Sequence, residues 1–505
     1  MNRFDMLAHA RERRVWDLLI IGGGATGLGM AVDAASRGHA VLLAERGDFA
    51  QGTSSRSTKL IHGGVRYLKQ GNVALVMEAL KERGRLRRNA PHLVHDLAFV
   101  VPSYAWWQSP FYGIGLKIYD LLAGEYGFGA SRHLDGAEVL AAIPTIETAG
   151  LLGGTRYFDG QFDDARLALA LARTAASHGA TLVNYCAAVS LIKRGGQVRG
   201  AVLRDGETGD EFTVEAKVVV NATGPFCDEL RRLDDPEARP IIAPSQGTHL
   251  VLPRGFLPGD AAIMVPGTRD GRVMFAIPWL GRTLVGTTDV GIAAATAEPV
   301  PRDDEIDFLL ETANAYLARH ATRQDILSAF AGIRPLVSGE GASTSSLSRE
   351  HSLLIDPMSG LLTVAGGKWT TYRRMAEDAV DLAQTLGSLP ERPCVTANLP
   401  IDADAAPGIA AIASSSEVPD RQVQAGQPLT TAAIRWYCRE EMARRVEDVL
   451  SRRSRCLLLD ARAAVAAAPS VARLMAAELG HGEDWVAAEI SAFTALAAGY
   501  LPSGS

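Results

Sequence analysis

The sequence has few cysteines and no long apolar run, and each shortage argues against a class of protein. Its five cysteines are scattered over 505 residues, with no C-x-x-C pair. This pattern disfavours a disulfide framework and a structural metal site, and it is typical of a reducing compartment. No stretch offers the roughly 18 apolar residues of a transmembrane helix, and the N-terminus has no apolar core of a secretory signal. We therefore expect a protein that is soluble or bound to a membrane surface.

The sequence also lacks a strong excess of charge of one sign. Lys and Arg number 51 and Asp and Glu number 57, which gives a formal net charge of −6. A chain-wide basic surface for nucleic acid is therefore not expected, although a local site for a small anion remains open. Hydrophobic residues make up 47% of the chain and charged residues 21%, a composition typical of globular proteins. The length predicts about two to four domains.

The N-terminal region has the pattern of a dinucleotide-binding βαβ unit. An apolar run, 15–21, is followed by three glycines in G-x-G-x-x-G spacing, Gly22, Gly24 and Gly27, and then by a helical pattern. The glycines allow a tight turn, a close approach to a pyrophosphate, and packing of the helix on the strand. A second strand pattern ends at Glu45, where a carboxylate can bind a ribose hydroxyl and disfavours a 2′-phosphate. The unit therefore predicts FAD or NAD.

Helical and strand patterns continue through the first half of the chain. Asn72 is a candidate N-cap for a helix that extends to residue 88. A second helix is predicted over 163–178, because acidic residues cap its start and Gly179 ends it. Short strand patterns follow between residues 181 and 221. These elements extend the α/β pattern of the N-terminal unit.

The second half of the chain changes character. Residues 246–290 alternate apolar and polar residues with Gly and Pro between them, which predicts an antiparallel sheet. Residues 303–319 predict an exposed helix. The stretch 403–427, rich in Ala, Ser, Gly and Pro, is the best candidate for a linker. Residues 430–498 have helical periodicity and few strand signals, which predicts a small helical domain.

The segment 52–67, GTSSRSTKLIHGGVRY, is dense in hydroxyls, glycine and cations. Composition alone favours an exposed polar loop. Its order of residues, however, resembles the signature of FAD-dependent glycerol-3-phosphate dehydrogenases, within the wider D-amino-acid-oxidase-like flavoprotein group. The likeness continues in further motifs: VVNATGP (219–225), GTHLVLP (247–253), PW (278–279), GTTD (286–289), GIRPL (332–336), SRE (348–350), GGKWTTYR (366–373), REEMA (439–443) and DVLSRR (448–453). It covers nearly the whole chain; 104–160 and 403–427 match least.

The resemblance implies an α/β fold with three domains. A Rossmann-like FAD-binding domain is expected in the discontinuous ranges 14–95, 150–240 and 350–400. An antiparallel-sheet substrate domain is expected in 96–149 and 241–349. The third is a C-terminal helical domain, 428–505, for which the residues suggest no chemical role.

The resemblance implies FAD-dependent oxidation of sn-glycerol 3-phosphate to dihydroxyacetone phosphate, with hydride transfer from C2 to the flavin. Bidentate arginines suit the substrate phosphate, and Arg66, Arg334 and Arg349 match the substrate site of the family, with Tyr67 expected to orient the substrate. His249 matches the active-site histidine and is the candidate base. Lys368, the third catalytic candidate beside His249 and Arg334, matches a lysine near the flavin that can stabilise negative charge.

The expected FAD-binding residues match the family motifs. They are Gly22, Gly24, Gly27, Glu45, Thr53, Ser54, Lys59, His62, Ala222, Thr223, Gly224 and Thr370. His62 is a position where a histidine could hold flavin covalently; non-covalent binding is the favoured interpretation. No metal is expected.

Eight aromatic residues lie between Tyr104 and Phe128, a concentration that suits the interface of a membrane. A core element or a homodimer contact is an equal alternative. The family resemblance implies a cytoplasmic protein, peripheral on the inner face of the cytoplasmic membrane, with quinone as electron acceptor. The alternatives are an oxidase that uses oxygen, a dehydrogenase of another polyol phosphate, and a flavin-containing scaffold protein.

Overall fold

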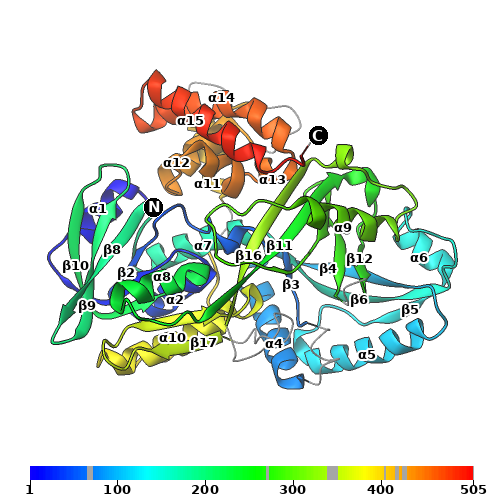
Figure 1. Ribbon diagram of the computed structural model, residues 1–505, viewed down its shortest axis with the longest axis horizontal. Coiled ribbons are helices and arrows are strands. Elements are labelled where there is room, and N and C mark those ends of the chain that lie inside the picture. Colours follow the sequence, from blue (N-terminus) through cyan, green and yellow to red (C-terminus); the bar gives the residue numbers. More distant parts are fainter. Residues whose placement is uncertain are drawn as a thin grey trace.

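The computed structural model describes residues 1–64, 72–268, 272–337, 351–402, 405–415, 420–423 and 429–503. Two sheets lie side by side, and a group of C-terminal helices lies across one end of them (Figure 1). The predicted fold class, an α/β protein with a second, largely antiparallel sheet and C-terminal helices, is confirmed.

The first sheet is built around strand β1 (Val15–Ile21). Its path runs β17 (His351–Ile355), β18 (Leu362–Gly366), β10 (Glu211–Asn221), β1, β2 (Val41–Ala44) and β7 (Thr181–Val183). Strand β1 pairs in parallel with both β10 and β2. Leu18 and Ile20 pack toward helices α2 (Ala25–Ser36), α7 (Asp164–Ser177) and α10 (Tyr372–Leu386). Leu19 and Ile21 pack toward β8 (Cys186–Arg194) and β9 (Gln197–Asp205). Burial on both faces explains why β1 is a continuous apolar run.

The two helices predicted in the first half of the chain are confirmed, and so are their caps. Helix α4 (Val73–Asn89) begins after Asn72, whose side chain accepts a hydrogen bond from the amide of Leu75. Helix α7 begins after Asp163, which caps the amide of Arg166 in the same way. These side chains replace partners that the first amides of a helix lack.

The second sheet follows the path β15 (Val290–Gly291), β11 (Ile242–Pro253), β14 (Arg282–Gly286), β13 (Met274–Trp279), β12 (Ala262–Val265), β4 (Val94–Ser103), β6 (Gly153–Phe162) and β3 (Leu60–Ile61). Strand β16 (Ser328–Val337) pairs with β11, and β5 (Arg132–Leu134) pairs with β6. The antiparallel sheet predicted over 246–290 is confirmed. The sequence did not predict β4 and β6, which extend this sheet.

Two predicted elements are wrong in detail. Helix α9 (Asp303–Asn314) ends five residues before the predicted end, and it is not simply exposed. Ile306, Leu309, Leu310 and Ala313 form a buried stripe at helical spacing and pack against the second sheet. The predicted linker contains helix α11 (Ala406–Ser415), which packs on α12 (Thr431–Glu440) because Gly408 lets the ring of Trp436 approach closely.

The predicted C-terminal helical region is confirmed. It contains α12, a short π-helical turn (Asp448–Arg453), α13 (Cys456–Leu459), α14 (Ala461–Leu479) and α15 (Glu483–Ala498). Its apolar core continues into the second sheet through Val251, Leu284 and Phe330. The described residues also form the α-helices α1 (Arg3–Ala10), α5 (Gln108–Ala123), α6 (Gly136–Ala142) and α8 (Cys227–Asp234).

The contact between β1 and α2 leads to a first prediction. A Cβ added at Gly27 would lie 1.9 Å from the carbonyl oxygen of Gly22. We expect Gly27→Ala to destabilise the fold at or above the upper end of the ~1–3 kcal/mol usual for overpacking. Gly113→Ala in α5, where the added Cβ meets nothing within 4 Å, is the control and should melt at or slightly above the wild type, because alanine favours a helix over glycine. Equal melting temperatures of all three proteins, measured by circular dichroism, would contradict the packing argument.

Candidate functional site

A crevice of about 400 Å³ lies at the carboxyl ends of the parallel strands of the first sheet. This is the usual place for a ligand in a doubly wound sheet. Most of the predicted cofactor residues line it: Gly22, Gly24, Glu45, Thr53, Ser54, Ala222, Thr223 and Gly224. The structure thus brings together residues from four separate parts of the sequence.

The glycines of the first loop each meet a distinct steric demand. Gly22 has φ +114°, and a Cβ there would lie 2.5 Å from the carbonyl oxygen of Ala222. Gly24 is the N-cap of α2, and its missing side chain leaves the crevice open at the helix N-terminus. Gly27 lies outside the crevice and packs against Gly22, so its contribution is to hold α2 on β1.

Glu45 lies in the crevice wall with its carboxylate tied to the main chain. One oxygen accepts from the amide of Gly23 at 2.6 Å, and the other accepts from the amide of Gly47 at 2.8 Å. Burial raises the pKa of the Glu45 carboxyl, while these two amides oppose the shift. Each carboxylate oxygen retains acceptor capacity, so the position suits the binding of a ribose hydroxyl.

A second cavity, of about 290 Å³, adjoins the crevice. Five residues line both spaces: Thr53, Pro335, Gly367, Lys368 and Trp369. The second cavity lies against the second sheet, whose strands β11 and β16 contribute His249 and Arg334. A ligand in the crevice can therefore meet a second molecule at this junction.

His249 is 2% exposed, on strand β11. Its Nε2 lies 2.8 Å from the hydroxyl of Thr58, and its ring stacks on Phe330. A Cβ at Gly286 would lie 2.2 Å from the imidazole, so this position of the GTTD motif has to be glycine. Burial lowers the pKa of His249 well below its usual value, and the positive charges of Arg334 and Lys59 lower it further. The imidazole is therefore neutral near pH 7, the form that accepts a proton.

Arg334 extends from strand β16 toward an acid in the cavity wall. Its guanidinium donates to the carbonyl of Thr288 at 3.0 Å and to the hydroxyl of Thr287 at 3.2 Å, and lies 3.5 Å from Asp289. Arg272 donates to the main-chain carbonyl of Asp289 and also lines the cavity. Gly247 makes room for Arg334, because a Cβ there would lie 2.4 Å from the guanidinium. Arg272 and Arg334 thus line the same cavity, an arrangement that suits an anionic ligand.

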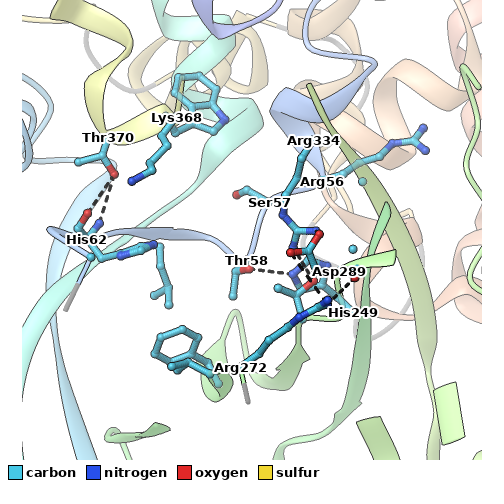
Figure 2. A pocket seen from close by; sticks show the side chains of 18 of the residues that line it. Arg56, Ser57, Thr58, His62, His249, Arg272, Asp289, Arg334, Lys368 and Thr370 are labelled. Carbon is cyan, nitrogen blue, oxygen red and sulfur yellow. Dashed lines mark hydrogen bonds and ion pairs between the residues drawn. The ribbon is translucent and has the colours of Figure 1, made fainter. Parts of the chain in front are cut away.

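Lys368 and Thr370 lie on one side of the cavity, and Arg334, Asp289 and His249 lie on the other (Figure 2). Lys368 comes between β18 and the short turn Trp369–Thr371. The hydroxyl of Thr370 is 3.3 Å from the amide of His62, which holds the two segments together. His62 and Thr370 line this second cavity, whereas Lys368 lines both spaces.

Lys59, a predicted cofactor residue, is buried against the N-terminus of helix α7. It lines neither cavity, and its ammonium contacts both carboxylate oxygens of Asp164, at 2.9 and 2.8 Å. The Lys59 side chain is fully buried, and its ammonium also lies near the rings of Trp279 and Phe330. Its position fits a structural contact rather than the predicted contact with the cofactor. Arg66, Tyr67 and Arg349 lie outside the described residues.

Thr58, Asp289 and Arg272 make polar contacts in the cavity wall but were not singled out by the sequence. Thr58 belongs to the hydroxyl-rich segment, but its pattern does not separate it from Ser57 or Thr53. Asp289 ends the GTTD motif, and its value as a contact for arginine could have been read there. Arg272 stands in a polar stretch with no periodicity, so only the structure reveals its place beside Asp289.

Family models match most of the chain. Residues 17–373 match the FAD dependent oxidoreductase family, and residues 404–486 match the C-terminal domain of alpha-glycerophosphate oxidase. A mitochondrial glycerol-3-phosphate dehydrogenase of Arabidopsis thaliana is 41% identical to this chain, over 92% of this chain and 82% of the plant protein. The enzyme of the same name from Rattus norvegicus is also 41% identical, over 95% of this chain and 73% of its own length.

Two solved structures resemble this chain in fold. The glycerol-3-phosphate dehydrogenase of Bacillus halodurans, solved with FAD, superposes with a TM-score of 0.81 at 28% identity, over 100% of this chain and 98% of that chain. Glycine oxidase from Geobacillus kaustophilus gives a TM-score of 0.54 at 21% identity, over 76% of this chain and 98% of its own. The second likeness shows a shared fold alone.

The environment of His249 predicts its behaviour with pH. Since burial and two cations lower its pKa, we expect the imidazole to stay neutral as the pH falls through ~6.5, where an exposed histidine gains its proton. Histidine-selective isotope labelling and NMR can follow all eleven rings. The resonance missing from His249→Asn identifies this residue, and its shift should be unchanged between about pH 7.5 and pH 6. A midpoint near 6.5 would contradict the assignment of a buried neutral base.

Proposed function

This chain belongs to the family of FAD-dependent glycerol-3-phosphate dehydrogenases, and we propose that it oxidises sn-glycerol 3-phosphate to dihydroxyacetone phosphate and passes the electrons to a membrane quinone. Its cofactor is FAD. The observation that carries the function is the junction at Lys368, where a nucleotide crevice opens into a cavity lined by the neutral His249 and by Arg272 and Arg334. Cofactor and substrate chemistry therefore have adjoining places.

The residues present fit FAD. Glycines line the crevice at the start of α2, where a side chain would obstruct a pyrophosphate. Glu45 offers a carboxylate to a ribose, and the loop Thr53–Ser54 lies at the passage to the second cavity. When bound, FAD supplies the acceptor for the hydride that leaves C2 of the substrate.

The protein's own residues handle the proton and the charge. Oxidation of an alcohol requires that the hydroxyl proton leave as the hydride departs. His249, neutral and buried, accepts this proton, while Thr58 orients its ring through Nε2. Lys368, at the junction, stabilises the negative charge that develops on the oxygen or on the reduced cofactor.

The substrate phosphate is held by arginine. Arg334 is anchored by Asp289, Thr287 and Thr288, so its planar group is oriented before the ligand arrives. Arg272 supports the same wall from the other side of Asp289. Arg66, Arg349 and Tyr67, which lie outside the described residues, are proposed as further substrate-binding residues on the family motifs alone. A phosphorylated polyol is therefore the class of substrate.

The test compares substrates with and without phosphate. Hydrogen bonds to charged groups contribute ~1.5–3 kcal/mol each, so glycerol, which loses two or three, should reduce the flavin ~10³-fold less efficiently than glycerol 3-phosphate. Arg334→Lys should shrink this ratio at least ~10-fold, because an ammonium lacks the planar fork. Arg302→Lys, on an exposed arginine paired with Asp304, is the control and should leave the ratio unchanged. Anaerobic stopped-flow absorbance measures the reduction, and similar rates with both substrates would refute the proposal.

Helix α5 supports the proposed membrane contact. Trp107, Phe111, Ile114, Ile118 and Leu121 follow at intervals of four and three residues, so they form one stripe along the helix. All five are exposed, and Leu121 is 81% exposed; Leu116, Tyr119 and Ala123 are buried on the other side. The helix lies at the outer edge of the molecule (Figure 1). An exposed apolar stripe of this kind binds to the interface of a bilayer.

No helix within the described part of the chain is long and apolar enough to cross a membrane. We infer a peripheral association through α5, on the cytoplasmic face of the membrane, where a quinone dissolved in the bilayer can accept electrons. The alternative occupant of the stripe is a second copy of the chain.

The membrane contact can be tested by substitution on α5. Phe111→Ser/Ile114→Ser/Leu121→Ser should release the protein from liposomes and lower activity with a membrane quinone at least ~10-fold. Dye-linked activity should stay unchanged, because these three side chains are exposed and line neither cavity. Phe4→Ser and Met358→Ser, at residues about as exposed but outside α5, are the controls. Co-sedimentation measures binding. Persistent binding would contradict a membrane contact through α5. A wild-type dimer that the triple substitution dissociates in solution would favour the second copy.

A further inference from the structure

Three buried arginines of the C-terminal helical region contact the part of the chain that lines the FAD crevice. Arg452, Arg453 and Arg455 lie in and just after the turn Asp448–Arg453, and their side chains are 2%, 0% and 2% exposed. A buried guanidinium is costly unless its donors are paired. The acidic partners of these arginines therefore show where the C-terminal helical region is attached to the rest of the protein.

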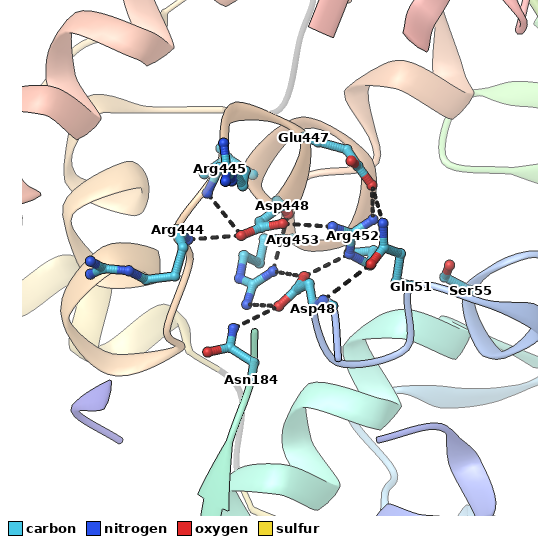
Figure 3. A network of polar contacts seen from close by, with 12 residues as sticks. Asp48, Gln51, Ser55, Asn184, Arg444, Arg445, Glu447, Asp448, Arg452 and Arg453 are labelled. Carbon is cyan, nitrogen blue, oxygen red and sulfur yellow. Dashed lines mark hydrogen bonds and ion pairs between the residues drawn. The ribbon is translucent and has the colours of Figure 1, made fainter. Parts of the chain in front are cut away.

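The first partner is Asp48, three residues after Glu45. The guanidinium of Arg453 donates hydrogen bonds to both carboxylate oxygens of Asp48, and Arg452 donates to one of them through Nε at 2.6 Å (Figure 3). Arg452 also contacts Glu447 and Asp448 within its own turn. Asp48 is fully buried, and its carboxylate is neutralised by two cations from a region more than 400 residues away in sequence.

The second partner is Asp163, the cap of helix α7. Arg455 donates to Asp163. The residue after Asp163, Asp164, contacts the far end of the loop 48–59, the loop that begins at Asp48. Asp164 contacts the ammonium of Lys59 and accepts from the hydroxyl of Ser57 at 2.7 Å. The C-terminal arginines thus attach to the loop 48–59 directly at its start and through α7 near its end.

Between these two attachments the loop carries the cofactor and base contacts. Thr53 lines both cavities, and the hydroxyl of Ser54 accepts from the amide of Ala25 at the start of α2. Thr58 holds Nε2 of His249. The loop therefore joins the nucleotide crevice to the histidine, and a shift of either end would move these contacts.

We propose that Arg452, Arg453 and Arg455 are positioning residues, through which the C-terminal helical region holds the loop 48–59 in the shape that retains FAD. The proposal gives a physical role to a region that contributes no residue to the lining of either cavity within the described residues. It rests on the binding of FAD and not on the identity of the substrate, so it can fail while the proposed reaction stands.

The experiment measures FAD retention in matched full-length variants. Arg453→Met removes the two hydrogen bonds from Arg453 to Asp48. It should raise the dissociation constant of FAD at least ~10-fold, measured by ultrafiltration well below the melting temperature. Asp48→Asn, which keeps the shape and removes the charge, should do the same and serves if Arg453→Met does not fold. Arg453→Lys should restore part of the affinity. The visible absorption bands of the bound flavin should shift in the variants that loosen the loop.

The control is Arg444→Met. Arg444 joins the same C-terminal region to the first sheet by pairing with Glu207 at 2.6 Å, but its side chain does not contact the loop. It should lose less than ~3-fold in FAD affinity. Equal losses in Arg444→Met and Arg453→Met would mean that docking of the whole region matters, which overturns the proposal. So would a folded Asp48→Asn that has a lowered melting temperature but wild-type FAD affinity and spectrum.

Discussion

Lys59 and Asp164 form an ion pair that is fully buried between the loop 48–59 and helix α7. Burial lowers the pKa of the Lys59 ammonium, and the carboxylate of Asp164 opposes that shift. The residue also has φ +63°, a left-handed conformation that costs roughly 1–2 kcal/mol in a non-glycine residue. Such a residue persists only where its surroundings hold it. The pair fixes the point at which the loop turns from the crevice into strand β3, and thereby places Thr58 beside His249.

The charges around the second cavity form one electrostatic system. Arg334 and Lys59 both lower the pKa of His249, and burial contributes most. Arg334, which suits an anionic substrate, therefore also helps to keep the base unprotonated. Asp289 balances part of this charge and orients Arg334 and Arg272. In such a site one arrangement of charges both attracts an anion and keeps the histidine able to accept a proton.

Local pattern predicted many of the elements and fewer of their contacts. The βαβ unit, helices α4 and α7 and the strands of 246–290 follow from periodicity and caps that act over a few residues. The exposed helix and the linker failed because burial depends on partners far away in sequence: α9 packs on the second sheet, and α11 packs on Trp436. The family motifs grouped His249, Arg334 and Lys368, which line one cavity, but they did not reveal the ion pair of Lys59 with Asp164, 105 residues away.

The sequence by itself determined the dinucleotide-binding start, the family and many of the residues that line the two cavities, because glycine spacing and short motifs are properties of neighbouring residues. Only the tertiary structure decided what each residue does. It gave Lys59 a structural partner, brought Arg272 and Asp289 to Arg334, and set three C-terminal arginines against Asp48 and Asp163. Buried charges require partners, and the packing of the two sheets and the C-terminal helices determines which partners lie within reach.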